Sequence, residues 1–404
     1  MVRLALLLVI NLFLAGCVSQ TVKSTQVPAV KTAAEVVPEE LLLDVGVAVF
    51  DPGLEGYEEK EGVERVYPEV RRAEALYMPN LMAEAIQQSG AWGAVRVVPS
   101  SEQITDVMVQ STILKSNGEE LELQVQATDS RGYTWLDKKY SGKASRYAYD
   151  STTRMQVDPF QAVYNNIAND LLDQLQSLRP EDRRNNRLVT ELLFARSFSP
   201  DAFDGYLQQN RKDVWLVMRL PAEGDPMLER VRGIQERDHL FVDTMQGHYE
   251  TFGYDMVGPY QEWRKLSYEE VVALKELKAE STRRLIAGGV AVLAGIAAAG
   301  SSDGYSRSAG NVAIIGGGYL LKSGLEQRAE AQIHIGALEE LGMSLEAEIA
   351  PQVIELEDRT VTLSGNVEDQ YAQWRALLAE IYRAEIGSLE PLAADPEAAD
   401  TLPD

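Results

Sequence analysis

Cysteine and histidine are scarce in this sequence. Its 404 residues include one cysteine, Cys17, and three histidines. A single thiol cannot form an internal disulfide, which excludes a disulfide-stapled scaffold. We assign neither a serine nucleophile elbow nor a His-Glu-x-x-His zinc motif. The sequence therefore predicts a protein that is not an enzyme and that uses no cofactor and no metal.

Basic residues are also few. The chain has 38 Lys and Arg against 62 Asp and Glu, a formal charge of −24. Nucleic-acid binding depends on Lys and Arg that neutralise phosphates, so a nucleic-acid partner is excluded. General attraction of the whole surface to anionic lipid is excluded on the same ground. An acidic surface that keeps the protein dispersed is the simplest interpretation.

The apolar run at the N-terminus, Leu4 to Leu14, is too short to span a bilayer as a helix, which takes about 20 residues. It follows Arg3 and leads into small residues, which is the layout of a secretory signal peptide. We therefore expect residues 1–16 to be a signal peptide. This is either an ordinary signal peptide that contains a cysteine by chance or a signal peptide of the kind that is cut before an acylated cysteine.

The four residues Leu14-Ala15-Gly16-Cys17 resemble the lipobox of bacterial lipoproteins. The resemblance implies that the chain is cut before Cys17 and that this cysteine is acylated, for example with palmitate. Two or three acyl chains anchor a protein stably in a bilayer. Val18 follows the cysteine, where Asp would favour the inner membrane. The resemblance therefore implies a lipid anchor in the outer membrane, facing the periplasm.

The next two segments are expected to be a tether and a domain. Residues 17–40 lack periodicity and predict a flexible lipidated tether. Residues 41–180 predict an α/β domain in which strands at 44–50 and 94–98 precede an antiparallel meander at 107–141. The middle strand of the meander alternates apolar and polar side chains at every position from Leu121 to Thr128.

Two helices are expected to cover this sheet. One has Pro79 in its first turn and ends at Ser89, and the other is opened by Asp158-Pro159. The order strand, helix, strand, meander, helix resembles periplasmic modules of the curli-secretion lipoprotein, the N-terminal domain of the Tol β-propeller protein and the lipoprotein activators of penicillin-binding proteins. The phrases at 76–82 and 89–98 resemble auxiliary lipoproteins of lipid-transporting ABC systems. These resemblances imply binding to other envelope proteins.

Residues 181–284 predict a wholly helical region. Ser199-Pro200 and Asp225-Pro226 have the form of an N-cap followed by the first helical turn. Ser267-Tyr-Glu-Glu270 has the form of a capping box. A stripe of apolar residues at helical spacing predicts core, and its members are Val231, Ile234, Phe241, Met245, Tyr249 and Phe252. The aromatic residues that could line a groove here are Trp215, Tyr254, Tyr260 and Trp263.

Residues 285–325 form a glycine-rich hydrophobic pair of runs, at 285–300 and 309–321, that resembles the glycine-zipper hairpins of bacterial surface lipoproteins. Small residues recur every four positions in the first run, which lets another helix approach closely. The residues expected to pack against the membrane or another helix are Ala287, Ala291, Gly295, Ala299, Gly316, Gly317 and Gly318.

Two placements of this pair remain open, and a third interpretation is disfavoured. Both runs are shorter than a full membrane span. They either enter the membrane, in a shallow or oligomeric form, or form a buried helical hairpin. The stretch from Gly317 to Ser323 resembles a phosphate-binding loop. Such a loop needs Gly before its Lys, and Leu321 precedes Lys322 here.

The C-terminal part predicts a small αββα module at 326–386 and an acidic disordered tail at 387–404. The hairpin strands are expected at 351–356 and 360–365, between a helix at 327–348 and a helix at 368–384. The phrase Arg359-Thr-Val-Thr-Leu-Ser-Gly-Asn-Val367 resembles the small BON domain, which is associated with membrane surfaces. The final strand of that domain is missing.

One trio of side chains is a candidate metal site. Glu236, His239 and Asp243 are spaced to share one helix face, as metal ligands on a helix do. A solvated charged face is the competing interpretation and the one that we prefer. An enzyme acting on the cell wall or on lipids is a third class of function, and its activity would depend on this trio.

Together these features predict an α+β protein. It has an N-terminal α/β sandwich-like domain with an antiparallel meander, a helical region with a glycine-rich hairpin and a small αββα module. The expected function is that of a non-enzymatic binding or scaffold lipoprotein of the envelope. The alternative is an oligomeric, membrane-inserting component of a secretion or transport channel. The expected partners are the bilayer, through acylated Cys17, an envelope protein of unknown identity and other copies of the chain.

Overall fold

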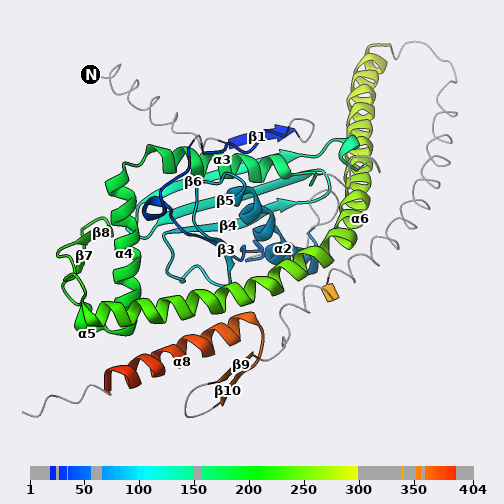
Figure 1. The fold of residues 1–404 in the computed structure, drawn as a ribbon. Helices are drawn as coiled ribbons and strands as arrows, with labels where there is room; N and C mark the ends of the chain where they lie inside the picture. The colour runs from blue at the N-terminus through cyan, green and yellow to red at the C-terminus, as the bar shows by residue number, and fades with distance from the viewer. Residues whose placement is uncertain are drawn as a thin grey trace, which may run out of the picture.

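The computed structural model describes residues 19–23, 27–33, 35–55, 66–149, 157–298, 339–340, 352–355 and 360–387. The mixed α+β fold predicted from the sequence is confirmed (Figure 1). A large sheet comes first, helices follow, and a small strand pair with a helix ends the described chain.

The large sheet has six strands in the order β1-β6-β5-β4-β2-β3. Strands β4, β5 and β6 form the predicted antiparallel meander, whereas β2 pairs in parallel with β3 and β4, and β1 pairs in parallel with β6. The strands are β1 (Ser19–Lys23), β2 (Val45–Ala48), β3 (Val95–Val98), β4 (Val107–Ser116), β5 (Glu120–Asp129) and β6 (Thr134–Lys143).

Helix α2 (Pro68–Gln87) and helix α3 (Gln161–Ser177) lie against one face of the sheet and contact each other. The predicted alternation in β5 explains why one face is covered. Its apolar side chains, from Leu121 to Ala127, are fully buried under these helices, whereas Gln124 and Gln126 point to the other face and retain solvent contact. The core therefore lies between one sheet face and two helices.

The prediction that Pro79 lies in a first helical turn is wrong. Pro68 occupies the first turn of α2, and Pro79 lies inside the helix. Proline has no N–H to donate to the carbonyl four residues earlier. The carbonyl of Ala75, which loses that partner, accepts the backbone N–H of Phe50 at 3.0 Å instead. The neighbouring strand end thus satisfies the group that the proline leaves free.

The expected tether at 17–40 is bound to the domain at several of its described positions. β1 adds a strand to the sheet edge at β6. Further along, the side chains of Asn165 and Asn169 on α3 donate to the backbone carbonyls of Pro28 and Ala29, and Lys31 donates back to Asn169. Sequence periodicity could not indicate this, because the segment is held through its backbone.

The prediction that residues 181–284 are wholly helical is also wrong. Helices α4 (Pro180–Phe198) and α5 (Pro200–Phe203) precede a two-stranded hairpin of β7 (Leu207–Gln209) and β8 (Trp215–Val217). The turn is built by Asn210, whose side chain accepts the backbone N–H groups of Lys212 and Val214. The short hydrophobic run after it is extended because it pairs with β7.

Helix α6 (Pro226–Ala298) is one continuous helix of 73 residues. Asp225 caps its start as predicted, since its carboxylate accepts the N–H groups of Met227 and Leu228. The capping box predicted at Ser267 is wrong, because Ser267 lies within α6 and its hydroxyl accepts the N–H of Gly118. Figure 1 shows α6 running past α2 and then turning along the end of the sheet.

A buried ion pair holds α6 to the α/β domain. Arg264 is fully buried, and its guanidinium lies 2.6 Å from a carboxylate oxygen of Asp158, just before α3. The guanidinium also stacks on the ring of Tyr260 at 3.9 Å. The hydroxyl of Tyr260 donates to buried Glu74 on α2 at 2.6 Å. Removing one member of such a buried pair leaves an uncompensated charge, so the contact fixes where α6 lies.

The C-terminal strands β9 (Gln352–Glu355) and β10 (Thr360–Leu363) form the predicted hairpin, and helix α8 (Val367–Gly387) follows. Helix α8 packs along α6, where the rings of Trp374 and Phe241 stack with centroids 4.8 Å apart. The predicted stripe of α6 is confirmed as core, because all of its members are buried. The helix predicted at 327–348 lies outside the described residues except for 339–340.

Candidate binding pocket

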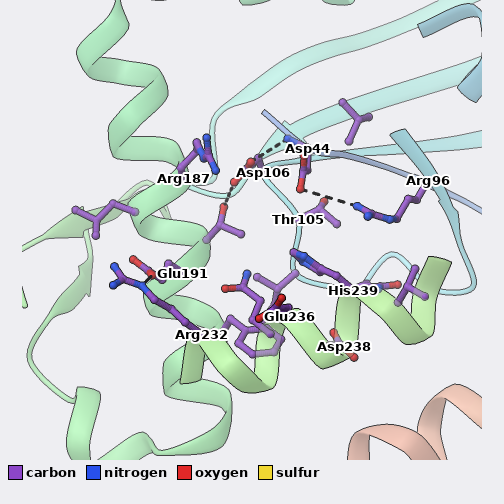
Figure 2. A pocket seen from close by; sticks show the side chains of 18 of the residues that line it. Asp44, Arg96, Thr105, Asp106, Arg187, Glu191, Arg232, Glu236, Asp238 and His239 are labelled. Atoms are coloured by element: carbon purple, nitrogen blue, oxygen red, sulfur yellow. Dashed lines mark hydrogen bonds and ion pairs between the residues drawn. The ribbon is translucent and has the colours of Figure 1, made fainter. Parts of the chain in front are cut away.

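A pocket of about 830 Å³ lies where β2 and β4 begin, between these strands and helices α4 and α6 (Figure 2). The 3-10 helix η1 (Glu39–Leu41) forms part of its rim. Charged side chains of both signs dominate the lining, and they include Glu39, Glu40, Asp44, Arg96, Asp106, Arg184, Arg187, Glu191, Arg232, Glu236 and His239.

Asp106 is the polar centre of the wall. One of its carboxylate oxygens accepts the hydroxyl of Thr190 at 2.5 Å, and the other accepts the backbone N–H of Asp44 at 2.9 Å. Its backbone carbonyl accepts the amide of Asn186 at 2.9 Å. Burial raises the pKa of Asp106 to about 6, although the hydrogen bonds from Thr190 and Asp44 to its carboxylate oppose the rise. The residue thereby ties β2 and β4 to α4.

The opposite wall is the edge of the sheet, and α6 covers it with side chains. The amide of Gln246 accepts the backbone N–H of Val97 at 3.0 Å and donates to its carbonyl at 2.6 Å. Arg96 forms an ion pair with Asp243 at 2.5 Å and lies 3.9 Å from Asp44. A side-chain amide thus takes the place of a neighbouring strand at β3, which protects an edge that could otherwise pair with another chain.

The remaining arginines of the lining also have partners on the protein. These contacts are Arg184 with Glu40 at 3.6 Å, Arg232 with Glu191 at 2.6 Å, and Arg187 with the backbone carbonyl of Glu39 at 2.5 Å. Among the described residues of the lining, only the hydroxyl of Thr190 bonds a carboxylate. That carboxylate is the buried one of Asp106. The charges of the lining are therefore largely paired with one another on the protein itself.

The three residues considered as metal ligands, Glu236, His239 and Asp243, make different contacts. Figure 2 shows Glu236 and His239 on the pocket side of α6. Asp243 instead bonds Arg96. Between them, Asp238 is buried and faces α8, where it lies 3.6 Å from Arg375. Within the described ranges no group of three or more His, Cys, Asp and Glu side chains could hold a metal ion.

The residues predicted for lipidation and packing fall mostly outside the described part of the chain. Cys17 lies outside it, as do Ala299 and the glycines at 316–318. Ala287, Ala291 and Gly295 lie in the last turns of α6, so the first glycine-rich run continues this helix as far as residue 298. None of the helices in the described ranges is both long and apolar enough to cross a membrane.

The prediction that the sequence has no serine nucleophile elbow needs one correction. Gly300-Ser-Ser-Asp-Gly304 does fit the Gly-x-Ser-x-Gly form of a nucleophile elbow. An elbow requires a strand before the serine and a helix after it. Here the preceding element is helix α6, which ends two residues earlier at Ala298. The pattern, like the phosphate-loop resemblance at 317–323, lies outside the described residues.

The aromatic residues considered for a groove do not form one. Tyr260 and Trp263 are buried and stacked, with ring centroids 5.8 Å apart. Tyr254 is exposed on α6, and the ring of Trp215 lies under the guanidinium of Arg196. Sequence reasoning missed the pocket itself. The available signal was the acid that directly precedes an apolar strand, as Asp106 precedes β4.

No protein-family model, curated protein or solved structure matches this chain.

Proposed function

We propose that the protein is a lipid-anchored, non-enzymatic binding or scaffold component of an envelope assembly. Leu14-Ala15-Gly16-Cys17 supports the anchor through its resemblance to the lipobox. The anchor places the protein on the periplasmic face of the outer membrane, with an envelope protein as its binding partner.

The length and placement of helix α6 are the main support for the scaffold role. The 73 residues of this helix follow a path of about 110 Å at 1.5 Å per residue, and the helix turns along the end of the sheet (Figure 1). Its first part is packed against α2, β3 and α8, and its last part is the start of the glycine-rich segment. A helix whose first part is fixed to a folded domain and whose last part begins a segment of small residues is suited to connecting two parts of an assembly.

The second candidate is an oligomeric component of a secretion or transport channel. Ala287, Ala291 and Gly295 are spaced by four within α6 and so recur along one side of the helix. Small residues in this pattern favour close helix packing between copies. Native mass measurement separates the candidates, since discrete rings support the channel and a monomer or a complex with another protein supports the scaffold.

The experiment for the anchor is an intact-mass measurement of the protein extracted from membranes. We expect a chain that begins at Cys17 and carries acyl chains on this residue. A Cys17→Ala variant should appear as uncleaved or unacylated protein. A mature chain that begins at another residue, with a free Cys17 thiol or without Cys17, would overturn the proposal.

A further inference from the structure

Three apolar side chains are exposed on and just after the β7–β8 hairpin. Leu216 lies in β8 and is 43 % exposed, and Met218 and Leu220, in the irregular chain just after β8, are 55 % and 70 % exposed. We call these three residues the apolar strip. Trp215 and Val217 point the other way and pack against the core. The strip therefore begins at the outward side chain of β8 and continues into the exposed chain that follows the hairpin.

The hairpin is rigidly mounted on the turn between β5 and β6. The N–H of Trp215 donates to the carbonyl of Arg131 at 2.7 Å. Gly132 has a φ of +96°, and a Cβ on it would lie 2.7 Å from the carbonyl oxygen of Asp213. Only glycine allows this approach of the two turns. The strip consequently keeps a fixed position at this end of the sheet.

The hairpin is basic in a strongly acidic chain. Between residues 206 and 221 it carries Arg211, Lys212 and Arg219 against a single acid, Asp213. All four are exposed, and the guanidinium of Arg219 lies 3.9 Å from the centre of the Tyr206 ring. Exposed apolar side chains flanked by Arg and Lys fit the boundary between acyl chains and anionic headgroups of a bilayer.

The pairing of β1 turns its N-terminal end, which follows Cys17 by two residues, toward the end of the sheet that holds the hairpin. β1 runs parallel to β6 with Ser19 opposite Lys139, near the middle of β6, and the N-terminal end of β1 faces the start of β6 at Thr134. The β5–β6 turn that holds the hairpin directly precedes Thr134. Two residues span at most about 7 Å, so Cys17 stays close to Ser19.

From these observations we propose that the apolar strip is a second membrane contact, which inserts into the bilayer that holds acylated Cys17. The proposal rests on the lipid anchor of the proposed function. The proposal also implies an orientation of the protein on the membrane. Lys275 of α6 pairs with Glu119 and Glu120 at the β4–β5 turn, the opposite end of β5. The glycine-rich end of α6 thus leaves the domain about 33 Å from the strip, by the length of a ten-residue strand.

The test uses the full chain without its acyl anchor. A Cys17→Ser protein with a cleavable signal is purified and mixed with vesicles of phosphatidylethanolamine and phosphatidylglycerol. Leu220→Asp is compared with Leu240→Asp, an equally apolar residue that is 64 % exposed on α6. We expect Leu220→Asp to weaken vesicle binding by about tenfold or more and Leu240→Asp to leave it unchanged. Circular dichroism verifies that both variants are folded.

A second pair of measurements examines the charges. Arg211→Glu with Lys212→Glu should weaken binding to these vesicles and have little effect on phosphatidylcholine vesicles, which have no net charge. Equal binding by Leu220→Asp and its control overturns the proposal, as does a protein that binds no vesicles. Neither result bears on acylation of Cys17, because that residue is serine throughout. Failure of the strip and failure of the anchor are therefore distinguishable.

Discussion

Asp106 shows how one residue can make the stability of this protein depend on pH. Its folded-state pKa is about 6, whereas an unperturbed Asp has a pKa of about 3.9. Between these values the folded protein keeps a proton that the unfolded chain has released. The free energy of unfolding therefore falls as pH rises through this window, by at most roughly 3 kcal/mol.

The Asp106→Asn variant tests this dependence. Asparagine can accept the N–H of Asp44 and donate to the hydroxyl of Thr190, and it does not titrate. We expect urea unfolding at about pH 4 and about pH 7 to show a smaller loss of stability in the variant than in the parent protein. Asp255→Asn, a change at an exposed acid on α6, is the control. A variant at Asp106 that loses as much stability as the parent would contradict the assignment.

At the scale of elements, the main contact is between the β4–β5 turn and α6. A Cβ on Gly118 would lie 2.0 Å from the carbonyl oxygen of Arg264 and 2.2 Å from the amide nitrogen of Tyr268. Both atoms belong to helix backbone and cannot rotate away. The hydroxyl of Ser267 and the side chain of Lys275 also bond this turn. Glycine at 118 is thus a requirement of helix docking.

A pair of glycine substitutions measures this requirement. Gly118→Ala should lower the free energy of unfolding by about 3 kcal/mol, since the turn and the helix must separate. Gly247→Ala lies on α6 with no other atom within 4 Å of its added Cβ. It should raise stability by about 0.5–1 kcal/mol through helix propensity. Chemical denaturation of both variants checks the signs, and a neutral Gly118→Ala would show that α6 is not docked as described.

The same elements show what the sequence could predict. The alternation of Leu121, Leu123 and Val125 and the stripe of α6 were sufficient because each reflects burial along one element. Ser267 was misread because its capping pattern is local, whereas its hydroxyl bonds a turn 149 residues away. The acid before β4 was a signal for one wall, but the assembly of the pocket could not be predicted, since β2, β3, α4 and α6 each supply part of it. Only contacts that are distant in the sequence bring Asp106, Thr190 and Arg96 together.

At the scale of the whole molecule, the two ends of the sheet have different surroundings. One end carries the hairpin with the apolar strip, and the N-terminal end of β1 faces it; the other end carries the contact from which α6 continues into the glycine-rich segment (Figure 1). On this account the protein sits on its membrane by the first end. The last turns of α6, with which the glycine-rich segment begins, then extend from the second end toward a partner or other copies of the chain.

The most direct test of a lipid-anchored scaffold is membrane fractionation of a Cys17→Ser variant with a cleavable signal, followed by an alkaline carbonate wash. We predict that the variant moves to the soluble periplasmic fraction, because a weak contact such as the apolar strip does not survive this wash. The parent protein should stay in the pellet. A Cys17→Ser protein that remains in the carbonate-washed membrane would contradict the account and favour insertion of residues 285–321.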